Sequence, residues 1–159
     1  MSGLDGMASG LRSGGRTRGE VFGLLLRQFV GAPYAWGGSG PSGTDCSGSV
    51  CACLSRATGR SIRVTADELY RRQFTEDAAG PGFLSGRIAA AFFLDGEGRA
   101  VHVAGHMGDG LFLNASSIEE GRRARVRTWP ELCRMYPGFA PRLRVYTGPR
   151  LPGGKGAAV

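Results

Sequence analysis

The chain has 159 residues, 42% of them hydrophobic, which is enough apolar material for the core of one compact domain. This length excludes a protein of several domains. Its 28 glycines show no three-residue period, so a collagen-like chain is excluded and a loop-rich globular domain is favoured. The formal net charge of +7 indicates attraction to an acidic partner such as nucleic acid, a membrane surface or a cell-wall polymer.

The apolar segments are too short to cross a bilayer. The longest, 21–26 and 88–94, fall far below the roughly 20 apolar residues of a spanning helix. The first twenty residues lack the apolar stretch and cleavage site of a Sec signal. We therefore expect a chain made in the cytoplasm, with no Sec signal and no membrane span.

One folded domain is expected over residues 16–147. Segments 1–15 and 148–159 are rich in Gly, Ser, Arg and Pro and have little periodic apolar content, which predicts two flexible tails.

Two capping-box patterns predict helix starts within the domain. Thr17 and Glu20 open a helix that continues to about Gln28, and Thr65 and Glu68 open a second, short helix. In a capping box the threonine and glutamate side chains each bond the other residue's backbone N–H, which satisfies donors that a helix start leaves free.

A further helix is expected between these two. A glycine-rich loop over 36–43 is followed by Thr44 or Asp45 as the cap, by a helix from about Cys46 to Thr58, and by Gly59 as its stop. This places Cys46 in the first helical turn.

The second half of the domain has the pattern of an antiparallel sheet. Apolar runs alternate with tight turns, and 108–110 has the composition of a hairpin loop. Strands are expected at 88–94, 99–107 and 111–115, with edge strands at Val126 and 143–146. The predicted fold class is α+β, with N-terminal helices packed on a central antiparallel sheet.

Cys46 is the first candidate for chemistry. The free N–H groups and the dipole at a helix start stabilise a thiolate, so we expect a lowered pKa. A lone cysteine is more often a small buried residue, so the assignment of a nucleophile depends on a base within reach.

The chain has two histidines, and both lie on the predicted strand 99–107. Side chains alternate along a strand, so His102, Ala104 and His106 share one face. His106 lies near the end of the hairpin, so on spacing alone His102 is favoured as the base and His106 is the alternative.

The predicted hairpin gives His102 a partner. Pairing Met107 with Leu111 places Ala104 opposite Asn114, and His102 and Asn114 become diagonal neighbours about 7 to 8 Å apart. An asparagine oxygen can hold one imidazole nitrogen and leave the other for the thiol, as in Cys-His-Asn catalysis.

These motifs together resemble those of the NlpC/P60 family of papain-like cysteine peptidases, which cut cross-bridges or stems of bacterial peptidoglycan. The segments that carry the resemblance are Gly31-Ala32-Pro33-Tyr34-Ala35-Trp36-Gly37-Gly38, Asp45-Cys46-Ser47-Gly48, Thr65-Ala66-Asp67, and His102-Val103 with Gly108-Asp109-Gly110 and Asn114.

The resemblance implies a papain-like fold in which Cys46 is the nucleophile, His102 the base and Asn114 the third polar residue. It further implies that Tyr34 points its hydroxyl toward the nucleophile and that Asp45 and Ser47 hold the free amine of an L-Ala-γ-D-Glu stem. Without the motif, Tyr34 reads equally well as loop packing and Asp45 as a helix cap. Trp36 is expected to pack beneath the loop rather than to form a ligand platform.

Two other chemistries are less favoured. Cys46, Cys51, Cys53 and Cys133 could be zinc ligands with a histidine, but the first three point in different directions on a helix and no C-x-x-C pair exists, so we expect no metal and no cofactor. The basic runs at 71–72 and 122–125 lack interleaved aromatic residues, so we expect no nucleic-acid partner.

The sequence therefore predicts a cysteine endopeptidase that cleaves peptidoglycan stems at the bond between γ-D-Glu and the diamino acid. The alternatives are a non-catalytic wall-binding or phage tail module of the same fold and a secreted antibacterial effector amidase. We expect a monomer that acts in the periplasm or cell wall, either virion-associated or exported as an effector, with a delivery or immunity partner as a further possibility.

Overall fold

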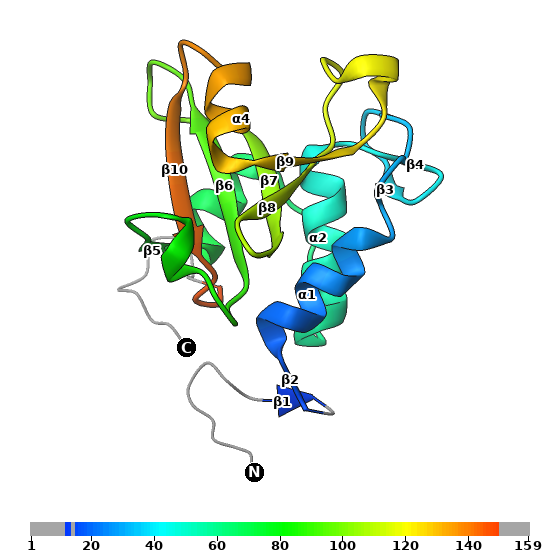
Figure 1. The fold of residues 1–159 in the computed structure, drawn as a ribbon, viewed down its shortest axis with the longest axis vertical. Coiled ribbons are helices and arrows are strands. Elements are labelled where there is room, and N and C mark those ends of the chain that lie inside the picture. Colours follow the sequence, from blue (N-terminus) through cyan, green and yellow to red (C-terminus); the bar gives the residue numbers. More distant parts are fainter. Residues whose placement is uncertain (1–11, 14, 150–159) are drawn as a thin grey trace.

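The computed structural model describes residues 12–13 and 15–149. The tails expected at 1–15 and 148–159 fall almost entirely outside the described residues. The described chain forms an α+β fold in which helices and a central antiparallel sheet pack side by side (Figure 1). This confirms the predicted fold class.

The two long helices begin and end where local sequence signals predict. Helix α1 (Arg18–Arg27) starts at the capping box of Thr17 and Glu20. Helix α2 (Cys46–Thr58) has Asp45 as its N-cap and ends at Gly59, whose left-handed φ of 76° a residue with a Cβ rarely adopts.

Shorter helical segments follow. Helix α3 (Ala66–Glu68) has the capping box predicted at Thr65 and continues as the π-helical turn η2 (Leu69–Gln73). The remaining segments are the 3-10 turns η3 (Pro81–Phe83) and η4 (Glu120–Arg122) and helix α4 (Trp129–Met135). In the described chain no helix is both long and apolar enough to cross a membrane.

The main sheet has six antiparallel strands in the order β5-β10-β6-β7-β8-β9. Their bounds are β5 (Glu76–Asp77), β6 (Ala89–Leu94), β7 (Ala100–Gly108), β8 (Leu111–Asn114), β9 (Arg125–Thr128) and β10 (Ala140–Val145). Two small hairpins lie outside it, β1 (Arg12–Ser13) with β2 (Arg16–Thr17) and β3 (Ser39–Gly40) with β4 (Gly43–Thr44).

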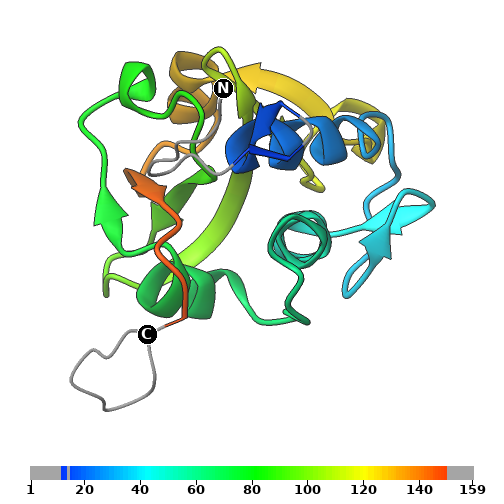
Figure 2. The ribbon, with the colours of Figure 1, turned by 90° about the horizontal axis from the view of Figure 1, so that it is seen from below.

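The sheet has a hydrophobic core on each face. Helices α1 and α2 pack against β7 on one face, and α4 covers the other (Figures 1 and 2). Because side chains alternate along a strand, Phe92 of β6 joins the first core and Phe93 joins the second. Both sides of β6 are therefore buried.

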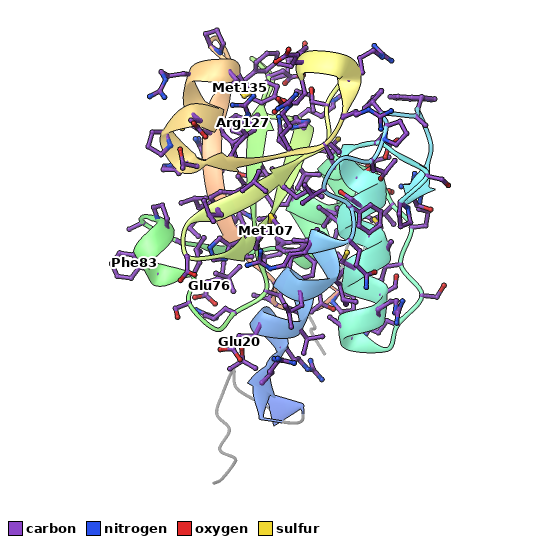
Figure 3. All side chains as sticks on the ribbon, turned by 45° about the vertical axis from the view of Figure 1, so that its right-hand side comes forward. Glu20, Glu76, Phe83, Met107, Arg127 and Met135 are labelled. Atoms are coloured by element: carbon purple, nitrogen blue, oxygen red, sulfur yellow. The ribbon has the colours of Figure 1, made fainter. Side chains whose placement is uncertain are left out.

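Helix α1 approaches β7 closely enough to exclude side chains at the contact. A Cβ at Gly23 would lie 2.5 Å from the carbonyl oxygen of Met107, and a Cβ at Gly105 would lie 2.8 Å from Leu26 Cδ1. Met107 lies beside α1 in Figure 3. These glycines let the helix backbone rest on the strand.

Two elements differ from the sequence-based expectations. Helix α4 was not predicted, although Thr128 and Glu131 form its capping box. The strand predicted at the edge over 143–146 lies between β5 and β6, because β5 pairs with its outer side. Val126 does lie on an edge strand, β9.

The β7–β8 hairpin is tighter at its tip than predicted. Gly108 pairs with Leu111, and a bulge at Met107 restores the expected register at the pair His106 and Phe112. Asp109 adopts a positive φ of 55° in the turn. The register beyond the bulge is the one on which the pairing of His102 with Asn114 depends.

Candidate active site

A cleft of about 960 Å³ lies where the start of α2 meets the sheet. The glycine-rich loop, the start of α2, the segment after α2, strand β7, the loop after β8 and the end of α4 all contribute to its walls. Cys46 and His102 both line this cleft. The structure thus brings the predicted nucleophile and base to one cavity from segments far apart in sequence.

Cys46 is the first residue of α2, as predicted, but its thiol is not acidified. Burial raises its pKa to about 11. Hydrogen bonds from the backbone N–H groups of Val103, Ser47 and Cys46 itself act in the opposite direction and are outweighed. The expectation of a lowered pKa is therefore wrong, because desolvation of the thiolate exceeds the stabilisation that a helix start provides.

His102 and Asn114 form the contact that the hairpin register predicts. His102 Nε2 lies 2.7 Å from Asn114 Oδ1, and both residues are buried. Burial lowers the pKa of His102 to about 4, although the hydrogen bond to Asn114 and the charge of Glu119 raise it. At pH 7 the imidazole is therefore uncharged and Nε2 is the nitrogen held by Asn114.

His106 has a different environment. Its ring packs on Phe112 with centroids 5.2 Å apart, and its Nε2 accepts a hydrogen bond from the Gly110 backbone at 3.2 Å. It lines a separate cavity between α1 and the hairpin tip rather than the cleft of Cys46. The geometry therefore favours His102 over His106 as the partner of Cys46.

The sequence interpretation did not identify three residues that contact Asn114 or its partner Glu119. Glu119 accepts a hydrogen bond from Asn114 Nδ2 at 2.8 Å, and Arg127 binds both carboxylate oxygens of Glu119 at 2.9 and 2.6 Å. Tyr136 stacks on His102 and reaches Asn114 with its hydroxyl. Arg127 and Met135, the neighbour of Tyr136, lie at the same end of the molecule in Figure 3.

Tyr34 lines the cleft beside Cys46. Burial raises the pKa of its hydroxyl, and the nearby charges of a Cys46 thiolate and of Asp45 add to this effect. The guanidinium of Arg122 lies over the ring, 5.4 Å from its centroid. Tyr34 is thus a neutral phenol close to the thiol.

Asp45 is fully engaged within the protein. One carboxylate oxygen accepts from Gly48 N at 2.7 Å and lies 3.7 Å from Arg63, and the other accepts from Gly37 N at 2.8 Å. Ser47 contacts both Asp45 and Arg63 at 3.5 and 3.4 Å. In this structure Asp45 caps α2 and ties the glycine-rich loop to the helix.

Trp36 does not pack beneath the loop. Its side chain is 89% exposed at the rim of the cleft. The expectation is therefore wrong: backbone hydrogen bonds hold the loop, such as that from the Asp45 N–H to the Gly38 carbonyl at 3.1 Å, and the indole is left in solvent.

The remaining cysteines have ordinary environments. Cys51 Sγ contacts the backbone N and O of Val64, each at 3.4 Å, and Cys53 is buried in the core beneath α1. All four cysteines are free thiols. Among the described residues, no group of three His, Cys, Asp or Glu side chains is arranged to hold a metal ion.

Comparison with known proteins gives the same family as the motifs. The model of the NlpC/P60 family matches residues 31–130. Murein DD-endopeptidase MepH of Escherichia coli K12 is 34% identical over 91 residues, covering 57% of this chain and 33% of MepH. Probable endopeptidase YafL of the same organism is 31% identical over 96 residues, covering 60% of this chain and 38% of YafL. The chain thus spans about a third of the length of these relatives.

Solved structures share the fold. The NlpC/P60 domain of the peptidoglycan hydrolase SagA has a TM-score of 0.54 and 27% identity, covering 80% of this chain and 97% of that one. RipD of Mycobacterium tuberculosis, described as a non-catalytic NlpC/P60 protein adapted to peptidoglycan binding, has a TM-score of 0.56 and 19% identity, covering 81% and 97%. The family match over most of the domain, with a fold shared by these structures, shows that the chain belongs to the NlpC/P60 family.

Proposed function

We propose that this protein is a cysteine endopeptidase that hydrolyses the peptide part of bacterial peptidoglycan. The observation that carries the proposal is the buried hydrogen bond between His102 and Asn114, in a cleft that Cys46 also lines. A non-catalytic binding domain has no need of an oriented imidazole beside a thiol. Relatives named as endopeptidases support the same activity.

The chemistry begins from neutral groups. Since Cys46 is a thiol and His102 an uncharged imidazole at pH 7, the proton moves from Sγ to Nδ1 as sulfur attacks the peptide carbonyl. The C–N bond then breaks, and His102 returns this proton to the leaving amine. The product is a thioester on Cys46.

Water completes the cycle. His102 removes a proton from a water molecule, whose oxygen attacks the thioester carbonyl, and the C–S bond breaks as sulfur is protonated again. We propose that backbone N–H groups at the start of α2, together with the neutral hydroxyl of Tyr34, stabilise the oxyanion of each tetrahedral intermediate; the position of Tyr34 in the lining of the same cleft supports this role. Asn114 holds the imidazole ring throughout.

We propose the bond between γ-D-Glu and the diamino acid as the site of cleavage, with Ser47 and the loop held by Asp45 beside the stem. Arg63 affects the role of Asp45, since its guanidinium already lies 3.7 Å from the carboxylate that would bind a free stem amine. The name of MepH favours a second candidate bond, the D,D cross-link between stems.

Digestion of purified sacculi tests both the activity and the bond. Mass analysis of the released fragments should show new amine termini on the diamino acid, whereas cleavage of the D,D bond would convert cross-linked dimers to monomers. Cys46→Ala should abolish release, and Cys133→Ala is the matched control that should retain it. Equal release by the Cys46→Ala variant would refute the proposal.

The alternative of a wall-binding module is favoured by one observation, the description of RipD. Sedimentation with sacculi separates the two hypotheses. A binding module would pellet with sacculi and release nothing, and Cys46→Ala would leave its binding unchanged.

We further propose that the protein acts outside the cytoplasm, delivered by a virion or exported as an effector. The net charge of +7 favours contact with anionic wall polymers. Expression of the chain confined to the cytoplasm or directed to the periplasm tests this, because lysis should need the periplasmic form. Lysis without export would contradict the proposed site of action.

A further inference from the structure

The amide of Asn114 lies between two side chains, one that bonds its oxygen and one that bonds its nitrogen. Its Oδ1 is 2.7 Å from His102 Nε2, and its Nδ2 donates to Glu119 Oε2 at 2.8 Å. The hydroxyl of Tyr136 lies 3.3 Å from Oδ1 and 3.2 Å from Nδ2, so it can donate a hydrogen bond to the oxygen or accept one from the nitrogen. The orientation of the amide is therefore decided by Glu119 and His102.

An ionised carboxylate can only accept hydrogen bonds. If the Asn114 amide turned over, its oxygen would face a carboxylate oxygen of Glu119 and two acceptors would meet in a buried site. Glu119 thus selects the orientation in which Asn114 Oδ1 faces His102. In that orientation Nε2 must carry the imidazole proton, and Nδ1 keeps a free lone pair.

Glu119 is kept ionised although its side chain is fully buried. Arg127 makes two hydrogen bonds to it, at 2.9 and 2.6 Å, and Arg125 lies 3.9 Å away. Burial raises the pKa of Glu119, but the hydrogen bonds from Arg127 and Asn114 and the two arginine charges hold it below its ordinary value. A carboxylate without these partners would be costly to bury.

We propose that Glu119, held by Arg127, is a positioning residue that orients the Asn114 amide and so fixes His102 in the tautomer with its proton on Nε2. Only this tautomer leaves Nδ1 free to accept the proton of Cys46. The proposal rests on the function proposed for Cys46 and His102. It assigns the ion pair a role in catalysis rather than in stability alone.

The variant Glu119→Gln tests the proposal. Glutamine can present either its oxygen or its nitrogen, so Asn114 is no longer forced into one orientation and His102 should populate both tautomers. We expect kcat for hydrolysis of a soluble stem peptide to fall about 10- to 100-fold with KM within about 2-fold, the range typical of residues that orient a catalytic or metal-binding group.

The tautomer is measured by ¹⁵N NMR of the imidazoles. The chain has two histidines, and His106 is an internal reference because its Nε2 accepts from Gly110 N, which places its proton on Nδ1. In the wild type we expect opposite tautomers for the two rings, and in Glu119→Gln a mixture at His102 alone. Glu120→Gln is the matched control, since Glu120 is 88% exposed and its carboxylate pairs with Arg125.

The outcomes separate the hypotheses. An unchanged Nε2–H tautomer in Glu119→Gln overturns the proposal, and so does a mixed tautomer with kcat unchanged. If the single variant fails to fold, the Glu119→Gln/Arg127→Gln variant leaves no buried charge unpaired and carries the same expectations; restored stability with full kcat would show a purely structural role. A wild-type protein that hydrolyses nothing would refute the proposed function, while the NMR spectrum still tests the tautomer.

Discussion

Tyr136 lies over the ring of His102, with centroids 4.6 Å apart and planes inclined by 30°. Its hydroxyl reaches the Asn114 amide at the same time. The tyrosine therefore covers the hydrogen bond between His102 and Asn114 from the side of α4. Excluding water from that bond strengthens it, because water would compete for both partners.

Two replacements of Tyr136 separate the effect of its ring, which shields His102 from water, from the effect of its hydroxyl. Tyr136→Ala opens the His102 site to water, and since burial is the main cause of the low pKa of His102, that pKa should rise toward its ordinary value near 6.5. We expect kcat to fall about 10-fold or more. Tyr136→Phe keeps the ring and is the matched control, with an effect of a few-fold. NMR titration of His102 measures the shift, and an unchanged pKa in Tyr136→Ala would contradict the role as a cover.

The reactivity of Cys46 should reflect the raised pKa of its thiol. Because burial raises its pKa to about 11, the rate of alkylation by iodoacetamide should keep rising above pH 9, whereas a model thiol with a pKa near 8.5 levels off. Peptide mapping by mass spectrometry distinguishes Cys46 from Cys51, Cys53 and Cys133. A rate that levels off below pH 8 would instead show a preformed pair of thiolate and imidazolium.

Acid should destabilise the fold through both histidines. Burial lowers the pKa of His102 and of His106 to about 4, so between this value and 6.5 the unfolded chain binds protons that the folded protein does not. The contribution of each histidine to the unfolding free energy is fully present above pH 6.5 and is lost as the pH falls toward 4. The loss is on the order of 3 kcal/mol per histidine.

The variant His106→Asn isolates one of these contributions. Asparagine can still accept from Gly110 N but does not titrate, so the loss of unfolding free energy between pH 7 and pH 4.5 should be smaller than in the wild type. Urea unfolding at the two pH values measures it. Equal losses in the two proteins would show that His106 titrates normally in the fold.

The contact of α1 with β7 should not tolerate a methyl group. Gly23→Ala places a Cβ 2.5 Å from the Met107 carbonyl oxygen, and a backbone atom cannot yield as a flexible side chain can. We expect a loss of about 1–3 kcal/mol in unfolding free energy. Gly96→Ala, with nothing within 4 Å, should stay within about 0.5 kcal/mol. If Gly23→Ala stabilised the protein, helix propensity would outweigh the close approach.

The parts of the fold that sequence could predict depend on short-range rules. Capping boxes at Thr17 and Thr65 mark helix starts because their hydrogen bonds span three residues. The pairing of His102 with Asn114 follows from a hairpin, where the turn sets the register. The start of α4 is also marked in the sequence, by the capping box at Thr128.

The parts that could not be predicted depend on tertiary packing. Glu119 lies in a loop whose sequence does not indicate that it faces Asn114, and Tyr136 reaches His102 only because α4 folds across the sheet. The pKa of Cys46 also depends on its surroundings. The helix start can be recognised in the sequence, but the burial that reverses its effect on the pKa depends on the packing of α2 against β7.

The exposure of Trp36 gives the protein a built-in optical reporter. The chain has two tryptophans, and Trp129 is partly buried against the core residues Phe93 and Phe112, with ring centroids 6.2 and 6.1 Å away. Emission from Trp36 at the rim of the cleft should resemble that of indole in water until a bound peptide covers the ring, while emission from Trp129 stays constant. Occupancy of the cleft could then be followed by a blue shift in fluorescence, without any label and in the inactive Cys46→Ala variant.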